Sequence, residues 1–337
     1  MGSNGVTIKD VAKAAGVSVT TVAQALNNNR PVNEDTRQRV LAVVESLGYI
    51  TSYSASHMKR KNSGIIGCFT VDISEDFTSR ILKGAEREVT ASGLSMLIAS
   101  GVEFGDDYDK ARRFFSSYNV DGLIICHHLS VDPGFIKALA NPGFPVVFVN
   151  IDYPNKHSII PDNKLAGSLA ADHLVSLGAK NLAFIGGPSN RLSVTQRLEG
   201  FSEKLKDLKI NFDKNLIVYG DYSFKDGLAN AEALYRINPN IDGLFCANDY
   251  IAAGALRFFE KQGKNIPQDL KIVGCDNREF SSFWDIPITT IQLPLEEMGA
   301  HAIKDLRSML QGQSVGPSQY LKPTLIKRES SINTDTE

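Results

Sequence analysis

The chain has 337 residues, of which 36 are Lys or Arg and 38 are Asp or Glu, and its formal net charge is −2. This length is enough for two or three domains with sizeable hydrophobic cores. No apolar run approaches membrane-spanning length, and the N-terminus lacks the apolar region of a signal peptide. We therefore expect a cytoplasmic protein with no membrane partner.

Catalytic and metal-binding chemistry is not indicated by the sequence. The cysteines lie in apolar, strand-like runs, and neither a CxxC pair nor a Cys/His cluster occurs. The histidines are scattered, and the nucleophile-elbow and phosphate-loop motifs of common enzymes are missing. We therefore expect no enzyme, no metal, no cofactor and no disulfide. The cysteines are Cys68, Cys126, Cys246 and Cys275.

Residues 7–29 have the pattern of a helix-turn-helix. Thr7 is placed to cap a first helix, Gly16 to end it in a left-handed conformation, and Ser18 to cap a second helix. Apolar residues recur at helical spacing in both segments, as expected for two helices that share a core. These residues are Ile8, Val11, Ala12 and Ala15 in the first helix, and Val22, Ala25 and Leu26 in the second.

The outward face of the second helix is short, polar and almost uncharged. It consists of Val19, Thr20, Thr21 and Gln24, near the end that a recognition helix directs to base edges. The alternative is an ordinary helical hairpin, but a solvated helix usually carries Glu and Lys on such a face. Residues 1–62 contain eight basic and four acidic residues, so the remainder carries a charge of −6. A basic head on an acidic body predicts that the head binds DNA.

A third helix is predicted over Glu34–Leu47, capped by Asn33 and ended by Gly48. Its apolar face completes a three-helix core with Val40, Val43, Val44 and Leu47. Residues 50–62 follow as a small, polar and basic stretch with little to bury. Such a stretch is typical of a linker that is disordered or forms a short helix on demand.

From Gly64 onward, strand-like runs alternate with helical stretches, the pattern of parallel sheets covered on both faces. Two sets of four strands predict two similar doubly wound α/β lobes, with a ligand cleft beyond the carboxyl ends of the strands. The first set is Ile65–Val71, Ser95–Ala99, Gly122–Cys126 and Val146–Asn150, with helices near 78–92, 107–117 and 132–140. The second is Leu182–Ile185, Leu216–Tyr219, Gly243–Cys246 and Ile272–Gly274, with helices near 163–177, 191–207, 225–236 and 249–262. A helix over 295–310 and a strand near 320–327 follow.

The order of helix-turn-helix, basic linker and two-lobed α/β body resembles the LacI/GalR (lac-repressor) family of bacterial transcription regulators. The resemblance extends over about residues 6–329 and is most specific in Thr7–Ala12 and Val17–Val22. Further matching stretches are Thr36–Val40, Leu47–Tyr49, Asp162–Gly167, Arg197–Phe201, Ala247–Asp249, Val273–Asp276, Thr289–Ile291 and Glu296–Gly299. So many stretches in the family's order make a chance likeness implausible.

The resemblance implies a homodimer that places two recognition helices on a pseudo-palindromic operator in double-stranded DNA and represses transcription. It also implies a body of the periplasmic-binding-protein type, with three strands that cross between its lobes. The expected boundaries are 1–49 for the helix-turn-helix domain, 50–62 for a hinge linker, 63–160 and 291–322 for the N-terminal lobe, and 161–290 and 323–330 for the C-terminal lobe.

Gln24 and Thr20 are the expected base readers. Gln can bond adenine N6 and N7 together, and the methyl groups of Val19 or Thr20 suit a thymine methyl. Thr7 and Thr21 are candidates for phosphate contacts at the helix starts. The family commonly has Ser-Arg where this chain has Ala23-Gln24, which implies an operator preference different from the lac type. Asn28 and Arg30 complete the contacts expected from the head.

The linker of the family folds into a hinge helix on the operator and inserts an apolar side chain, usually Leu, into the central minor groove. Met58 stands at that position here, and Met is apolar and pliable enough for the role. Thr51 replaces the usual Pro, and Ser52 replaces the Asn that follows it. A plain flexible tether is therefore the alternative to a hinge helix. The expected DNA contacts of the linker are Ser52, Ala55, Met58 and Lys59.

A cleft between the lobes is where the resemblance implies an effector site. Its expected residues are Ser74, Thr78, Asn150, Asp162, Arg197, Tyr222, Asn248 and Asp276. Arg197 offers a rigid fork of donors, and Tyr222 can stack on a sugar ring. The alternatives are helix caps for Asp162, Asn248 and Asp276, and a plain ion pair for Arg197.

The expected effector is a small polar molecule, a sugar or sugar derivative. Purine-binding members of the family use an aromatic platform where this chain has Thr78, which argues against a nucleobase. The alternative is a regulator of the same fold that answers to a protein partner rather than to a small molecule.

Overall fold

The computed structural model describes residues 6–27, 32–49, 63–70, 72–100, 108–126, 144–153 and 156–332. The chain separates into two compact units, Met1–Ile65 and Ile66–Glu337, and each is described here by itself. Among the helices of the described residues, none is long and apolar enough to cross a lipid bilayer.

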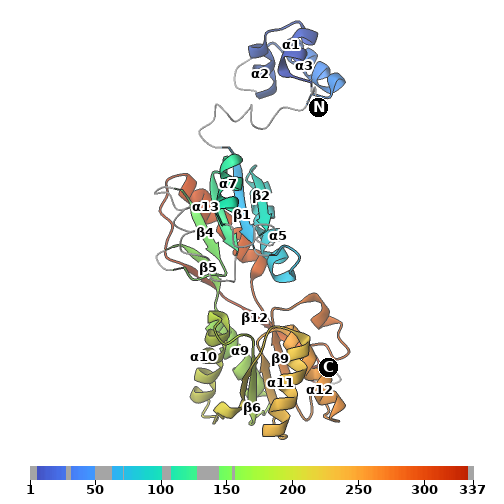
Figure 1. Cartoon of the computed structure of the whole chain (residues 1–337), viewed down its shortest axis with the longest axis vertical. Coiled ribbons are helices and arrows are strands. Elements are labelled where there is room, and N and C mark those ends of the chain that lie inside the picture. The colour runs from blue at the N-terminus through green and yellow to red at the C-terminus, as the bar shows by residue number, and fades with distance from the viewer. Residues whose placement is uncertain are drawn as a thin grey trace. The chain divides into compact units, whose positions relative to one another are not determined.

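The N-terminal unit is a bundle of three helices, α1 (Ile8–Ala15), α2 (Val19–Asn27) and α3 (Glu34–Leu47) (Figure 1). The helix boundaries follow the predicted caps, since Gly16 and Gly48 take left-handed conformations after α1 and α3. The buried side chains of the bundle are Val11, Ala12, Ala15, Val22, Ala25 and Val40. The predicted inward faces of α1 and α2 are therefore confirmed.

Leu47 does not join this core, contrary to the prediction, because 37% of its surface is exposed. The chain reverses at Gly48, and the amide of Tyr49 donates to the carbonyl oxygen of Val44 at 3.0 Å. This helix-ending turn brings Tyr49 against the core cluster instead.

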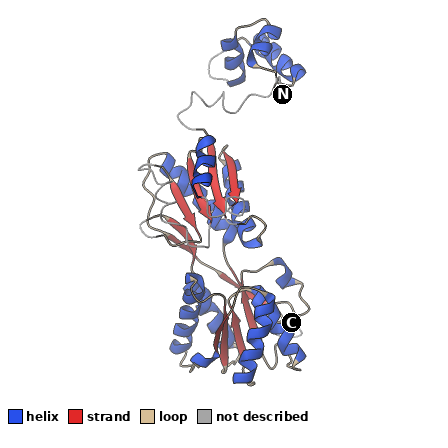
Figure 2. Cartoon of the chain, viewed as in Figure 1, coloured by secondary structure: helices blue, strands red, loops and turns tan. Residues whose placement is uncertain are grey.

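The C-terminal unit contains two six-stranded sheets, each with helices against it (Figure 2). The first sheet has the order β11 (Gln319–Leu321), β5 (Ser158–Pro161), β4 (Val146–Val149), β3 (Gly122–Cys126), β1 (Ile65–Thr70), β2 (Ser95–Ser100). The second has the order β12 (Thr324–Ile326), β10 (Thr289–Gln292), β9 (Lys271–Cys275), β8 (Gly243–Cys246), β6 (Leu182–Gly186), β7 (Ile217–Tyr219). β12 runs antiparallel to β10, whereas β6 to β10 pair in parallel.

The helices of the first lobe are α5 (Asp76–Ala91), α7 (Tyr108–Ser117) and α13 (Leu295–Leu310), and α13 packs against α5. Those of the second lobe are α9 (Asn163–Ser176), α10 (Leu192–Asp207), α11 (Phe224–Ile237) and α12 (Asp249–Lys261). There α9 packs on α10, and α11 packs on α12. Two short 3-10 turns, Lys214–Leu216 and Glu279–Ser282, complete the described helices. The predicted helix near 132–140 lies outside the described residues.

Three crossings join the two sheets, at 161–163, 292–295 and 321–324. The prediction of two sets of four strands is wrong, because β5 and β10 are strands of only four residues that were not recognised. The single strand expected near 320–327 is also wrong. Pro323 interrupts it, and the two pieces β11 and β12 belong to different sheets.

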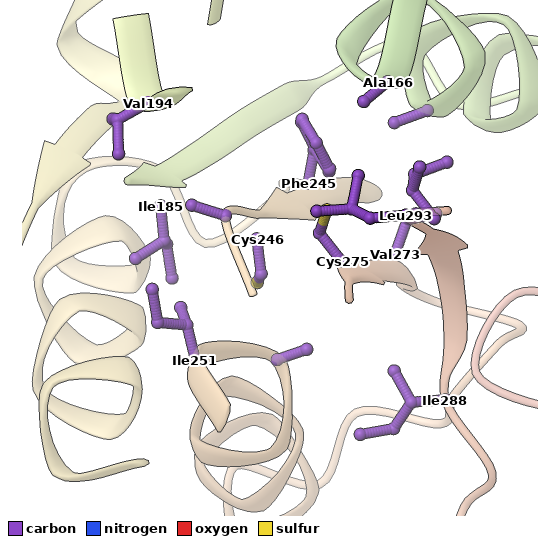
Figure 3. Close-up of a cluster of buried hydrophobic side chains, with 14 of the residues drawn as sticks. Ala166, Ile185, Val194, Phe245, Cys246, Ile251, Val273, Cys275, Ile288 and Leu293 are labelled. Carbon is purple, nitrogen blue, oxygen red and sulfur yellow. The ribbon is translucent and has the colours of Figure 1, made fainter. Parts of the chain in front are cut away.

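The core of the second lobe is apolar and tightly filled (Figure 3). Phe245, Ile185 and Val273 are fully buried on its central strands, and Ile251 of α12 lies on the face of the sheet to which Ile185 points. The four cysteines are all buried and free, and each lies on a strand, as the strand-like runs around them predicted.

Two helices of this lobe approach each other so closely that only glycine fits at their contact. A Cβ added to Gly167 on α9 would overlap the carbonyl oxygen of Arg197, and one added to Gly200 on α10 would overlap that of Lys164. The backbone contact fixes the height at which α10 presents Arg197.

We expect Gly167→Ala to separate α9 from α10 and to lower the free energy of unfolding by about 1–3 kcal/mol, because the new methyl group has no space. The measurement is urea denaturation of the full chain. Gly316→Ala is the matched control, since no atom lies within 4 Å of its added Cβ. Equal midpoints for the two variants would contradict the close packing.

Candidate functional site

The first turn of α1 is held by a carboxylate. The backbone amide and the hydroxyl of Thr7 both donate to Oδ2 of Asp10, at 2.8 and 2.6 Å. These bonds lower the pKa of Asp10, with Lys13 contributing to the same effect. Thr7 is exposed at the helix start as predicted, but its hydroxyl proton is already engaged within the cap.

The start of α2 is capped by Ser18, whose Oγ accepts from the amide of Thr21 at 3.1 Å. The Thr21 hydroxyl also lies 2.8 Å from that oxygen. Val19 is 41% exposed, Thr20 is exposed, and Gln24 is partly exposed one turn after Thr20. The predicted reading face is therefore open to a partner. The predicted contacts Asn28, Arg30, Ser52, Ala55, Met58 and Lys59 lie outside the described residues.

A cavity of about 350 Å³ lies in the C-terminal unit and is walled by both of its lobes. Five of the predicted effector residues line it: Asn150, Arg197, Tyr222, Asn248 and Asp276. The other lining residues are Glu75, Phe77, Ile151, Asp152, Ile160, Asn163, Asn190, Arg191, Leu192, Ser193, Gln196 and Arg278. The wall thus combines amides, charges and two aromatic rings.

Arg197 is the most deeply buried of the cations that line this cavity, with 5% of its surface exposed. Its Nε donates to Oδ1 of Asn163 at 3.0 Å, and its Nη1 donates to the carbonyl oxygen of Ala247. Its Nη2 lies 3.9 Å from Oδ1 of Asp276. The guanidinium plane is therefore fixed by α9 and by the end of β8.

Asn248 and Tyr222 are held to each other. Oδ1 of Asn248 accepts from the amide of Ile251 at 2.8 Å and so caps α12, while its Nδ2 donates to the carbonyl oxygen of Tyr222 at 3.1 Å. The cap and the cavity roles of Asn248 thus coexist. The Tyr222 ring lies against Gly187, where a Cβ would overlap it, so the ring has a defined position on the cavity wall.

Asp276 follows β9 in an unusual backbone conformation, since φ is +100° at Asp276 and +50° at Asn277. Its carboxylate faces Arg197 and also Arg278, whose Nε lies 3.8 Å from Oδ2. Burial raises the pKa of Asp276, whereas Arg197, Arg278 and Arg80 lower it, and the net shift is upward.

Asp249 lies fully buried behind this group. Its Oδ1 accepts from the hydroxyl of Thr290 at 2.6 Å, and its Oδ2 accepts from the backbone amide of Arg278 at 2.7 Å. Burial raises the pKa of Asp249 to about 8, and the nearby Asp276 contributes further. The carboxyl group is therefore mainly protonated at neutral pH.

Three predicted effector residues do not reach the cavity wall. Asp162 accepts from the amide of Leu165 at 2.9 Å and caps α9, which is the alternative role that the sequence left open. The Ser74 hydroxyl donates to Asp72 at 2.7 Å. Thr78 is buried within α5, with 5% of its surface exposed. Each of the three is adjacent in the sequence to a residue that does line the cavity.

Among the lining residues that were not predicted are Asn163, Gln196 and Arg278. Asn163 and Gln196 directly neighbour predicted residues in the chain, so extending each predicted site by one position finds them. Arg278 follows Asp276 by two positions and has the appearance of an ordinary charged loop residue. Within the described part of the chain, no cluster of three His, Cys, Asp or Glu residues is arranged to hold a metal ion.

Comparison with known proteins gives matches at both ends of the chain. Residues 7–52 match the bacterial regulatory proteins of the lacI family, and residues 171–331 match the periplasmic binding protein-like domain. HTH-type transcriptional regulator DegA of Bacillus subtilis is 30% identical over 340 residues, covering 98% of this chain and 99% of the relative.

Two further matches also cover nearly the whole of this chain. The ribose operon repressor of Bacillus subtilis is 30% identical over 330 residues, with 98% of this chain and 99% of the relative covered. The crystal structure of the lac repressor dimer bound to operator and the anti-inducer ONPF is 29% identical. Its TM-score is 0.87, and 98% of this chain and 100% of that chain are covered.

The buried proton of Asp249 has a testable effect on stability. An Asp in the unfolded chain ionises near pH 4, with a pKa of about 3.9, whereas the folded pKa is about 8. The folded state therefore retains a proton that the unfolded state has released, and this group makes the protein less stable as the pH rises from about 4 to about 8.

Asp249→Asn removes the titrating carboxyl group, but it also removes the carboxylate oxygen that accepts the hydrogen bond of the Arg278 backbone amide. We expect the Tm of the wild type to exceed that of the variant at pH 5 and the gap to narrow toward pH 8.

Scanning calorimetry at several pH values measures this gap. Asp207→Asn, at an exposed position, is the control and should give a curve parallel to the wild type. A gap between wild type and Asp249→Asn that stays constant with pH would show that Asp249 is ionised in the folded protein.

Proposed function

Since the chain belongs to the lacI family of bacterial regulatory proteins, we propose that it is a repressor whose operator affinity is set by a small polar effector. The family makes the chain a DNA-binding regulator of transcription, and the matched relatives are regulators rather than enzymes. In our proposal a homodimer in the cytoplasm binds a pseudo-palindromic operator, and the effector occupies the cavity of the C-terminal unit.

The cavity is the observation that carries the proposal. Its volume of about 350 Å³ lies at the lower end of the usual range for small-molecule sites, about 300–1,000 Å³. Fixed donors and acceptors line it, including Arg197, Asn248 and Asp276, and the Tyr222 ring forms part of its wall. Such a mixture suits a polyol, whose hydroxyl groups both donate and accept and whose ring carbons pack on an aromatic face. A carbohydrate is therefore the proposed class of effector.

A direct contact between the lobes gives the effector a route to the rest of the body. Nη1 of Arg80, on α5 of the first lobe, donates to the carbonyl oxygens of Asp276 and Asn277 in the second lobe, at 2.7 and 3.1 Å. A ligand that moves the Asp276 side chain would strain or relax this contact, and so favour one arrangement of the lobes.

The proposal is tested by a thermal-shift screen of the full chain with sugars, sugar phosphates and nucleosides. We expect at least one sugar or sugar derivative to raise the Tm and to change operator affinity in a binding assay. If no small molecule in the screen does either, control by a protein partner becomes the better explanation.

The helix-turn-helix at residues 7–29 generates a further prediction, for Gln24→Ala. Removing the amide should relax the preference for one base position in each half-site, at a cost of about 1–3 kcal/mol for the preferred base. Selection of binding sites from a random DNA pool, followed by sequencing, measures the change. Gln38→Ala is the matched control on α3, where Gln38 is exposed and bonds Glu34 within its own helix. Unchanged base preference in Gln24→Ala would exclude Gln24 as a base reader.

A further inference from the structure

The charged residues of the cavity differ in depth. Glu75 and Asp152 lie at exposed positions of its lining, where water screens them. Arg197 and Arg278 lie deeper, with side chains only 6% and 13% exposed. Arg191 adds a further cation at a half-buried position. The numbers of acids and bases are equal, but the least screened charges are mostly positive.

Asp276 alone cannot balance the two deep guanidinium groups. Its oxygens lie 3.9 Å from Nη2 of Arg197 and 3.8 Å from Nε of Arg278, and both distances exceed those of a hydrogen bond. The other buried carboxyl, Asp249, is mainly protonated at neutral pH because its pKa is about 8. One buried acid therefore faces two buried cations, and Arg80 brings a third positive charge to the backbone of the same loop.

Arg278 also has an unmet bonding requirement. Its Nε is buried and has no hydrogen-bond partner among the residues that the structure describes. Its guanidinium carbon lies 4.7 Å from the centre of the Tyr250 ring, a contact that supplies no hydrogen-bond acceptor to Nε. A buried donor without an acceptor costs free energy that an added acceptor recovers. The backbone amide of Arg278 is bonded to Asp249, so the main chain stays in place while the side chain can turn to a new acceptor.

We propose that the effector carries an anionic group, a carboxylate or a phosphate, which binds between Arg278 and Arg197 beside Asp276. A guanidinium fork matches the oxygens of either group and forms two parallel charge-assisted bonds. The hydroxyl groups of the same molecule are then bound by the amides of the wall, Asn248 and Gln196 among them. This inference rests on the proposed effector function and narrows it from sugars to acidic sugar derivatives.

Matched ligand series test the proposal with the full chain. Each series holds a neutral sugar, its acid and its phosphate: D-glucose, D-glucuronate and D-glucose 6-phosphate; D-galactose, D-galacturonate and D-galactose 6-phosphate; D-ribose, D-ribonate and D-ribose 5-phosphate. Calorimetric titration measures affinity. We expect an acid or a phosphate to bind at least about tenfold more tightly than the neutral sugar of its series. The acid and phosphate arms identify which anion is preferred.

Variants then assign the effect to Arg278. Arg278→Gln should weaken binding of the anionic ligand about ten- to hundredfold, while Arg278→Lys, which retains the charge but not the fork, should weaken it less. Arg236→Gln removes an exposed arginine of the same lobe and should leave the affinity unchanged. Thermal unfolding of each variant shows whether it is folded.

The outcomes separate this inference from the function on which it rests. If a neutral sugar binds as tightly as its acid and phosphate, or if Arg278→Gln folds and binds the anionic ligand as the wild type does, the anionic effector is overturned and the small-molecule effector stands. If no member of any series binds, the anionic effector is overturned and the effector function itself is contradicted for these sugars.

Discussion

The buried guanidinium of Arg197 is the constraint on which the second lobe depends. A charge with so little exposed surface is tolerable only if protein groups replace the water that it has lost. Asn163 and the carbonyl oxygen of Ala247 supply that replacement from α9 and from the end of β8. Asn163 lies on α9, so the close approach of α9 to α10 through Gly167 and Gly200 brings it within reach of Arg197. Helix packing thus supplies part of the solvation that the buried charge needs.

The same constraint extends to the loop after β9. Asp276 approaches Arg197 from a left-handed backbone conformation that a non-glycine residue rarely adopts. That path turns the following residues back toward the cavity, so Arg278 becomes part of its wall. It also directs two carbonyl oxygens outward to Arg80 of the other lobe. The loop therefore joins a ligand site and a contact between lobes within three residues.

Local signals in the sequence were sufficient for the helical head and for the family. Caps such as Ser18 and Asn33, and the glycines after α1 and α3, act within a few residues, so they can be recognised without tertiary structure. Only some of the residues that line the cavity could be predicted from such local signals. Asp162 and Asn248 have the same capping signature, yet only Asn248 lines the cavity, because the path of the surrounding chain decides the outcome. Arg278 could not be found at all without the backbone turn at Asp276. The strands β5 and β10 were missed because, in the described residues, each follows the preceding strand without an α-helix between them and so departs from the strand–helix alternation on which the prediction rested.

The order of the elements along the chain has a consequence for biosynthesis. The edge strand β11 and the helix α13 belong to the first lobe, but they follow the whole of β6 to β10 in the sequence. A ribosome therefore completes the central strands of the second sheet while the first lobe still lacks its last helix and strand. During that interval the strand β5 has no neighbour on one side, and the surface of α5 that later meets α13 is uncovered. The lobe that is begun first therefore stays incomplete until β6 to β10 of the other lobe have been translated, and the nascent chain exposes the apolar surface of the first lobe during that time.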